Sequence, residues 1–239
     1  MPMSSWRLMS RDPLVVLMIL LSATTGVVDA VSVLGLGKVF TANMTGNVVF
    51  LGFAAAGVPG FDWTLYVTGL VCFAIGAVLA GRISKAHANV SRRRWLVRAA
   101  LVEAGLLWLS AAVAIGMAPV SPGAGEIPWN AYAVIALSAA AMGSRNATAR
   151  QLKVADLTTT VLTLTITGIA SDSRLGGGSN PNLARRIAAV LAILLGAMLG
   201  AVMLTAWGLA PPLVLAGAAV LLATLALAHD APREPIAAT

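Results

Sequence analysis

The sequence predicts an all-α fold, a polytopic bundle of membrane helices that includes two broken or re-entrant segments. Hydrophobic residues make up 59% and charged residues only 10% of the 239 residues, whereas a soluble domain is nearer half apolar and a quarter charged. The apolar residues also form runs of about 20, the length of a helix that crosses roughly 30 Å of hydrocarbon. We therefore expect one membrane domain over residues 1–239.

Eight apolar segments follow one another along the chain. The first is longer than the apolar region of a signal peptide and precedes further spans, so we interpret it as a retained helix. The glycine- and serine-rich residues 171–180 are typical of an exposed loop. The eight segments cover residues 13–36, 39–57, 63–81, 95–118, 129–144, 154–171, 186–208 and 211–229.

The second and sixth segments differ from the others because they are short and rich in polar side chains. Asn43, Thr45 and Asn47 lie in the second, and threonines are frequent in the sixth. Backbone in hydrocarbon must satisfy its own hydrogen bonds, so a broken helix persists only against protein or water. The third and seventh segments instead carry small residues four apart, which favours close helix packing.

The two halves of the chain, about residues 13–118 and 129–229, resemble each other. Each matching motif is weak alone, because membrane sequences use few residue types, but four in the same order favour an internal duplication. The matching motifs are residues 26–30 with 143–147, 43–47 with 161–165, 76–80 with 196–200, and 101–105 with 213–217.

The basic residues indicate how the segments cross the membrane. If all eight crossed, with the basic loop 82–98 inside the cell, Arg174, Arg185 and Arg186 would lie outside, against the positive-inside rule. If the second and sixth segments are re-entrant, six helices cross and every Lys and Arg except Lys38 lies inside. We predict this arrangement, with both termini cytoplasmic and the halves forming an inverted repeat. Both segments are just long enough to cross, so a full crossing stays open.

Two interrupted helices at matching positions of inverted halves predict a binding site near the membrane midplane. Helix ends there would offer free N–H and C=O groups, and Gly46 would allow the close approach of a ligand or a second backbone. The alternative is that these polar residues only join helices to one another. The predicted substrate-binding residues are Asp29, Asn43, Thr45, Gly46, Asn47, Asn146, Thr159, Thr163 and Thr165.

Asp29 and Glu103 are acidic residues within apolar segments, where a carboxylate usually faces a cavity or a partner. Both are therefore candidates for proton coupling. The alternatives are that Asp29 caps the turn before Lys38 near the membrane surface and that Glu103 is a snorkelling or paired residue. Asn146 occupies the place of Asp29 in the second half, and we expect its neighbour Arg145 at the cytoplasmic edge as a topology anchor.

No enzyme signature occurs among H-E-x-x-H, G-x-S-x-G and the phosphate-binding G-x-x-x-x-G-K-[ST]. We therefore predict that the protein is not an enzyme and has no catalytic residues and no cofactor. The lone Cys72 permits neither a disulfide within the chain nor a cysteine-based metal site, and no carboxylate cluster marks a metal. The net charge of +7 lies in short loops, which indicates topology and contact with anionic lipid rather than nucleic acid.

The chain carries two pairs of motifs: D-A-V-S at 29–32 with F-T-A-N-M-T-G-N-V-V at 40–49, and M-G-S-R-N-A-T-A-R at 142–150 with D-L-T-T-T-V-L-T at 156–163. They resemble the two hallmarks of the YoaK-like family of bacterial membrane proteins, over about residues 13–229. The resemblance implies a bacterial inner-membrane protein and no particular function, since the family is known mainly as a domain of unknown function. The resemblance implies a small residue at position 164, as at Gly46, and Leu164 therefore weakens the case for a symmetric site.

These observations predict a secondary transporter or permease of a small solute that works by alternating access. The alternative is a structural or regulatory membrane subunit of a partner complex, and an intramembrane enzyme based on the buried acids is a weaker third hypothesis. The expected partners are the lipid bilayer and an unidentified small solute. Homo-oligomerisation stays open, and we expect no nucleic-acid partner.

Overall fold

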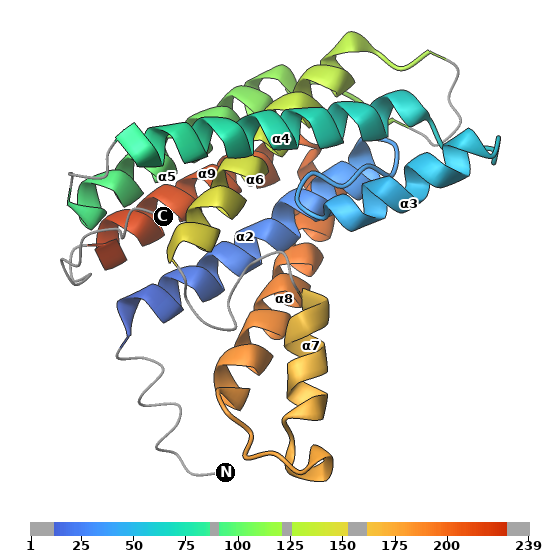
Figure 1. Cartoon of the computed structure of the whole chain (residues 1–239). Helices are drawn as coiled ribbons and strands as arrows, with labels where there is room; N and C mark the ends of the chain where they lie inside the picture. The colour runs from blue at the N-terminus through green and yellow to red at the C-terminus, as the bar shows by residue number, and fades with distance from the viewer. Residues whose placement is uncertain (1–11, 87–90, 121–125, 153–161, 229–239) are drawn as a thin grey trace.

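The chain forms a bundle of α-helices in a computed structural model, which describes residues 12–86, 91–120, 126–152 and 162–228 (Figure 1). Within these ranges every regular element is a helix, which confirms the predicted all-α class. The elements are α2 (Pro13–Gly35), α3 (Met44–Ala55), α4 (Trp63–Ala86), α5 (Arg92–Val113), α6 (Trp129–Leu152), α7 (Leu162–Ser171), the 3-10 turn η1 (Arg174–Gly176), α8 (Leu183–Trp207) and α9 (Ala210–Leu227).

Five of the described helices, α2, α4, α5, α8 and α9, are long and apolar enough to cross a membrane. The remaining long helix, α6, has 24 residues, about 36 Å at 1.5 Å per residue. It is not among the five, and its second half carries polar side chains that include Arg145, Asn146 and Arg150. The membrane-bundle prediction is therefore confirmed, with one long helix that is less apolar than the others.

In the part of the chain that the structure describes, α3 and α7 are shorter than a helix that crosses a bilayer, and α7 begins directly after residues 153–161, which lie outside the described residues. They have 12 and 10 residues, about 18 and 15 Å, against a hydrocarbon core of roughly 30 Å. α3 packs on α4 and α7 packs on α8, and each forms a hairpin with the long helix that follows it (Figure 1). Gly37, just after α2, lies directly against Leu65 at the start of α4. The chain between them, which contains α3, therefore starts and finishes at the same end of the bundle.

The hairpin of α7 and α8 is closed by one arginine. Arg186 Nη1 donates to the Gly168 carbonyl oxygen at 2.6 Å and to Asp172 Oδ2 at 2.7 Å. The hydrogen bond from Arg186, followed by that from Ser171, lowers the pKa of the Asp172 carboxyl below its ordinary value. These contacts tie the end of α7 to the start of α8.

Three predicted boundaries are wrong, two of them for a common reason. α4 continues past residue 81 to Ala86, α6 continues past 144 to Leu152, and α3 begins at Met44 rather than 39. A hydropathy run stops at the first charged residues, whereas the helix continues because Ala, Arg, Lys and Gln are good helix formers. The chain before α3 is instead held outside the helix by side chains described below.

The two most extensive helix contacts, α2 with α8 and α4 with α6, depend on glycines at which the backbones touch. A Cβ atom on any of these glycines would lie within about 2 Å of a carbonyl oxygen on the facing helix, so only glycine permits the approach. The predicted close packing is confirmed. These distances are 2.2 Å from Gly26 to Ile193, 2.0 Å from Gly143 to Phe73, 2.1 Å from Gly76 to Ala140, and 1.9 Å from Gly196 to Ala23.

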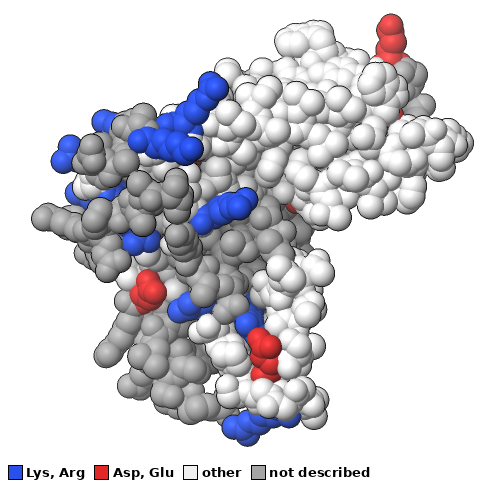
Figure 2. All heavy atoms as spheres, viewed as in Figure 1, with Lys and Arg blue, Asp and Glu red and all other residues white. Residues whose placement is uncertain are grey.

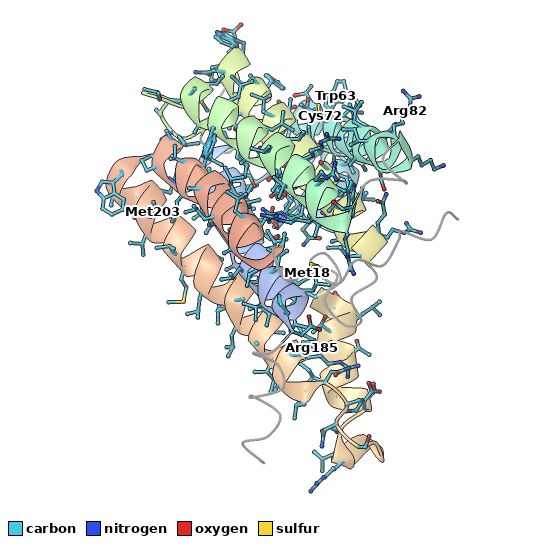
Figure 3. The ribbon with its side chains drawn as sticks, turned by 90° about the vertical axis from the view of Figure 1, so that its left-hand side faces the viewer. Met18, Trp63, Cys72, Arg82, Arg185 and Met203 are labelled. Carbon is cyan, nitrogen blue, oxygen red and sulfur yellow. The ribbon has the colours of Figure 1, made fainter. Side chains whose placement is uncertain are left out.

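Two hydrophobic clusters fill the bundle, one towards each end. The boundary between them falls between Leu21 and Val27 on α2 and between Ala100 and Leu107 on α5. Met18 belongs to the cluster at the start of α2 and is fully buried, whereas Figure 3 shows Arg82 at the outer edge. The boundary layer carries buried polar side chains, and it positions the candidate site.

Candidate functional site

A buried ion pair joins α5 and α6 in the layer between the two hydrophobic clusters. Arg145 Nε donates to Glu103 Oε1 at 2.6 Å, and Arg145 Nη2 donates to the same oxygen. The two side chains are only 1% and 6% exposed. A charge removed from water costs several kcal/mol unless it is paired, so each residue allows the other to be buried.

This pair bears on two sequence interpretations. Glu103 is a paired residue, as its alternative held, and the pairing leaves the prediction of proton coupling untested. The expectation that Arg145 lies at the cytoplasmic edge is wrong, because its side chain is buried against Glu103. The partner is 42 residues away in the sequence, and only the packing of α5 on α6 brings the two together.

The guanidinium of Arg145 also binds α2. Its Nη1 donates to the Leu21 carbonyl oxygen and to Thr25 Oγ1, both at 2.9 Å. A cavity of about 20 Å³ lies beside the pair and is also lined by Thr148 and by Thr224 of α9. This volume is enough for about one water molecule. Four helices therefore meet at the ion pair, with polar groups turned towards a small space.

Asp29 fastens the chain between α2 and α3. Its Oδ1 accepts the backbone N–H of Thr41 at 3.2 Å and that of Ala42 at 2.9 Å. These donors lie outside any helix, and a buried N–H without an acceptor would be costly. The alternative that Asp29 caps the turn before Lys38 is therefore wrong, because Asp29 accepts hydrogen bonds from residues that follow Lys38.

Asn47 holds the same loop through a single residue, Phe40. Its side-chain oxygen accepts the Phe40 N–H at 2.8 Å, and its Nδ2 donates to the Phe40 carbonyl oxygen at 2.6 Å. Gly46 lies under the Phe40 ring, where a Cβ atom would be 2.5 Å from the nearest ring carbon. The close approach predicted at Gly46 is therefore made by this ring. Both contacts hold the loop before α3, whereas the alternative expected the polar residues to join helices to one another.

The other predicted site residues are dispersed. Asn43, Thr45 and Thr163 are exposed and Thr165 is buried. Asn146 Nδ2 donates to the Met142 carbonyl oxygen at 2.9 Å, and Thr159 lies outside the described residues. The structure therefore gathers only part of the predicted set, around the loop before α3, while Figure 1 shows α3 and α7 against different long helices.

A polar stripe on α2, formed by Ser22, Thr25, Asp29 and Ser32, connects the ion pair with this loop. The four residues are spaced three, four and three apart, so they share one helix face. Ser22, Thr25 and Ser32 are buried, Thr25 binds Arg145, and Asp29 lies one turn further on. This spacing is visible in the sequence, and it could have identified the face of α2 that turns inward.

Comparison with known proteins covers nearly the whole helical region. The family model described as "Protein of unknown function (DUF1275)" matches residues 17–227. The chain belongs to the DUF1275 family. The match contains both the polar stripe and the Glu103–Arg145 pair, so the candidate site lies within the family region.

A curated relative of this DUF1275 chain is the UPF0700 transmembrane protein YoaK of Bacillus subtilis (strain 168). The two are 32% identical over 158 residues, which cover 65% of each protein, just under two thirds of the relative's length. The YoaK-like resemblance is confirmed, and the chain is a multi-pass membrane protein. No solved structure matches the chain.

Proposed function

We propose that this DUF1275 protein is a secondary transporter of a small solute that works by alternating access. The observation that carries the proposal is the pair of short helices that the structure describes, α3 and α7, at matching positions of the two sequence halves. Discontinuous helices at matching positions of inverted repeats form the solute and ion sites of many secondary transporters. The proposal contains no catalytic step and no cofactor.

The helix contacts support an internal repeat, which the proposed three crossings in each half would make an inverted one. In the proposed repeat, α2, α3, α4 and α5 of the first half correspond to α6, α7, α8 and α9 of the second. The contact of α2 with α8 then corresponds to that of α6 with α4, and the contact of α3 with α4 corresponds to that of α7 with α8. The contact of α5 with α6 likewise becomes that of α9 with α2, and α5 and α9 pack on each other. The main pairings are thus unchanged by the exchange.

The same contacts suggest which parts would move. We assign α3, α4, α5 and α6 to one group and α2, α7, α8 and α9 to the other, and the extensive contact between α5 and α9 then lies at the boundary of the two groups. The Glu103–Arg145 pair belongs to the first group, while its hydrogen bonds to Leu21 and Thr25 reach the second. In the proposed mechanism the two groups rock against each other, and the polar stripe of α2 lines the solute path.

Asp29 and Glu103 are the proposed proton-coupling residues, because ionisable residues inside a membrane bundle usually serve a transport path or a proton relay. We place the protein in the bacterial inner membrane with both termini cytoplasmic. Figure 2 shows Lys and Arg gathered where α4 ends and α5 begins, and the positive-inside rule assigns that end to the cytoplasm.

The test begins with a thermal-shift screen of the purified protein against a metabolite library, since a bound solute raises the apparent stability. Uptake of each hit is then measured in proteoliposomes with and without an imposed pH gradient. The variant Asp29→Asn keeps a side-chain oxygen for the Thr41 and Ala42 N–H groups but loses the charge, so it should insert normally and lose proton-driven uptake. The control, Glu126→Gln, changes an exposed acid outside the helices and should transport normally.

Unchanged uptake and unchanged proton dependence in Asp29→Asn would remove Asp29 from the mechanism. Absence of transport for every hit, together with a partner protein that copurifies in fixed proportion, would favour the structural or regulatory subunit instead.

A further inference from the structure

A groove lies on the outside of the bundle between α4 and α5, and residues of α6 form its floor. Its volume is about 350 Å³, within the range of small-molecule sites. α4 and α5 each pack on α6 but share no extensive contact in the described part of the chain, whereas the matching helices α8 and α9 do touch. The wider separation of α4 and α5 is therefore a difference between the described parts of the two halves.

The groove combines an apolar lining with a basic edge. Among the described residues that line the groove, Arg98 is the one charged residue, and its side chain is exposed. Further basic side chains, Arg82 and Lys85, lie at the end of α4 next to the start of α5, where Figure 2 shows a cluster of Lys and Arg. Apolar lining residues include Ala80, Ile83, Trp95, Leu101 and Val102.

We propose that this groove binds an anionic phospholipid of the surrounding bilayer, with an acyl chain along α4 and α5 and the phosphate at Arg98. A planar guanidinium binds phosphate oxygens in pairs, and a basic edge on an apolar channel complements an anionic amphiphile. Trp95, at the same end as Arg98, is almost fully buried and gives the groove an aromatic wall beside the guanidinium. This site does not depend on the transport proposal.

The lipid would also contact the structure around the ion pair. Ala99 and Thr148 line both the groove and the small cavity beside Glu103 and Arg145. An acyl chain in the groove would thus contact α5 and α6 at residues that also line the cavity beside the ion pair. Bound lipid is therefore expected to stabilise the arrangement in which the ion pair is closed.

The experiment is native mass spectrometry of the full chain, delipidated in detergent and mixed with equal amounts of phosphatidylglycerol and phosphatidylcholine that have identical acyl chains. We expect about fivefold preference for phosphatidylglycerol, the effect of one basic residue near a headgroup. Arg98→Gln should lose this preference. Arg93→Gln, an exposed arginine on the same helix outside the groove, should keep it.

A second variant tests the apolar part. Val102 is 41% exposed, so Val102→Trp can place a ring in the groove without repacking the core and should lower phosphatidylglycerol occupancy. Leu109→Trp, on the same helix and outside the groove, should not. Equal retention of both lipids by the wild type, or equal preference in Arg98→Gln and Arg93→Gln, overturns the proposal. So does displacement of the lipid by free glycerol phosphate at the same concentration, which would indicate a phosphate site without a lipid chain.

Discussion

Glu103 and Arg145 illustrate how single residues are accommodated in an apolar bundle. Neither could remain charged inside alone, but together with Leu21 and Thr25 they place the hydrogen-bonding groups of Arg145 against acceptors. A buried pair of this kind adds little net stability compared with apolar residues of the same size, yet breaking it is costly. Its contribution is therefore to fix which faces of α2, α5 and α6 meet.

Replacing Glu103 by Gln leaves Arg145 as a buried charge without a counter-charge. We expect the free energy of unfolding to fall by about 3–5 kcal/mol, measured by reversible denaturation in detergent. The double variant Glu103→Leu/Arg145→Met replaces both charges by apolar side chains of similar size and should recover most of this loss. If the double variant is as unstable as the sum of the two single changes, the residues do not act as a pair.

Asp29 gives a second prediction at this scale. Asp29→Ala removes the acceptor of the Thr41 and Ala42 N–H groups, and an unsatisfied buried donor costs about 1–3 kcal/mol. Hydrogen exchange at these two amides should therefore become faster, while Asp29→Asn, which keeps an oxygen, should change it less. Exchange as slow in Asp29→Ala as in the wild type would show that the carboxylate does not hold the loop.

At the scale of the element, the apolar runs predict where helices occur, and local interactions decide where they end. The run that starts at residue 39 yields a helix only from Met44, because Asp29 and Asn47 bind the preceding backbone in a non-helical conformation. A hydropathy pattern ends α6 too early, at Arg145, because the sequence alone does not show that Glu103 compensates the charge of Arg145 in the folded bundle.

The contact between α4 and α6 can be tested with two glycines of the same helix. In Gly76→Ala the new methyl group would overlap the Ala140 backbone, so we expect α4 to be displaced from α6 at a cost of about 1–3 kcal/mol. Gly81 has no atom within 4 Å of such a group, and Gly81→Ala should be neutral or stabilising by about 0.5–1 kcal/mol. Both are measured by thermal unfolding in detergent, and equal effects would contradict the glycine contact.

At the scale of the whole molecule, the proposed topology places the loop after α7 and the loop between α3 and α4 on opposite faces of the membrane. Arg174, in the first loop, and Val58, in the second, are both exposed. They therefore report the two faces directly, and the arrangement of the charged loops assigns Arg174 to the cytoplasm.

Single cysteines at these positions, in a Cys72→Ser background, should react differently with a membrane-impermeant thiol reagent. In intact cells we expect Val58→Cys to be labelled and Arg174→Cys to be protected, and in permeabilised cells we expect both to be labelled. Labelling of Arg174→Cys in intact cells would mean that the segment containing α7 crosses the membrane completely, and the inverted repeat would be lost.

The sequence by itself determined that this protein lies in a lipid bilayer, where its helices occur, which two segments are short and polar, and to which family it belongs. These are local properties, because apolar runs, basic loops and motifs are each contained in a few tens of residues. Only the tertiary structure decided that Arg145 is buried with Glu103, that Asp29 and Asn47 hold the loop before α3, and that α2 packs on α8. These features depend on contacts between residues distant in the sequence. A charge is buried favourably only beside its counter-charge, and helix backbones approach closely only where glycines of two helices face each other.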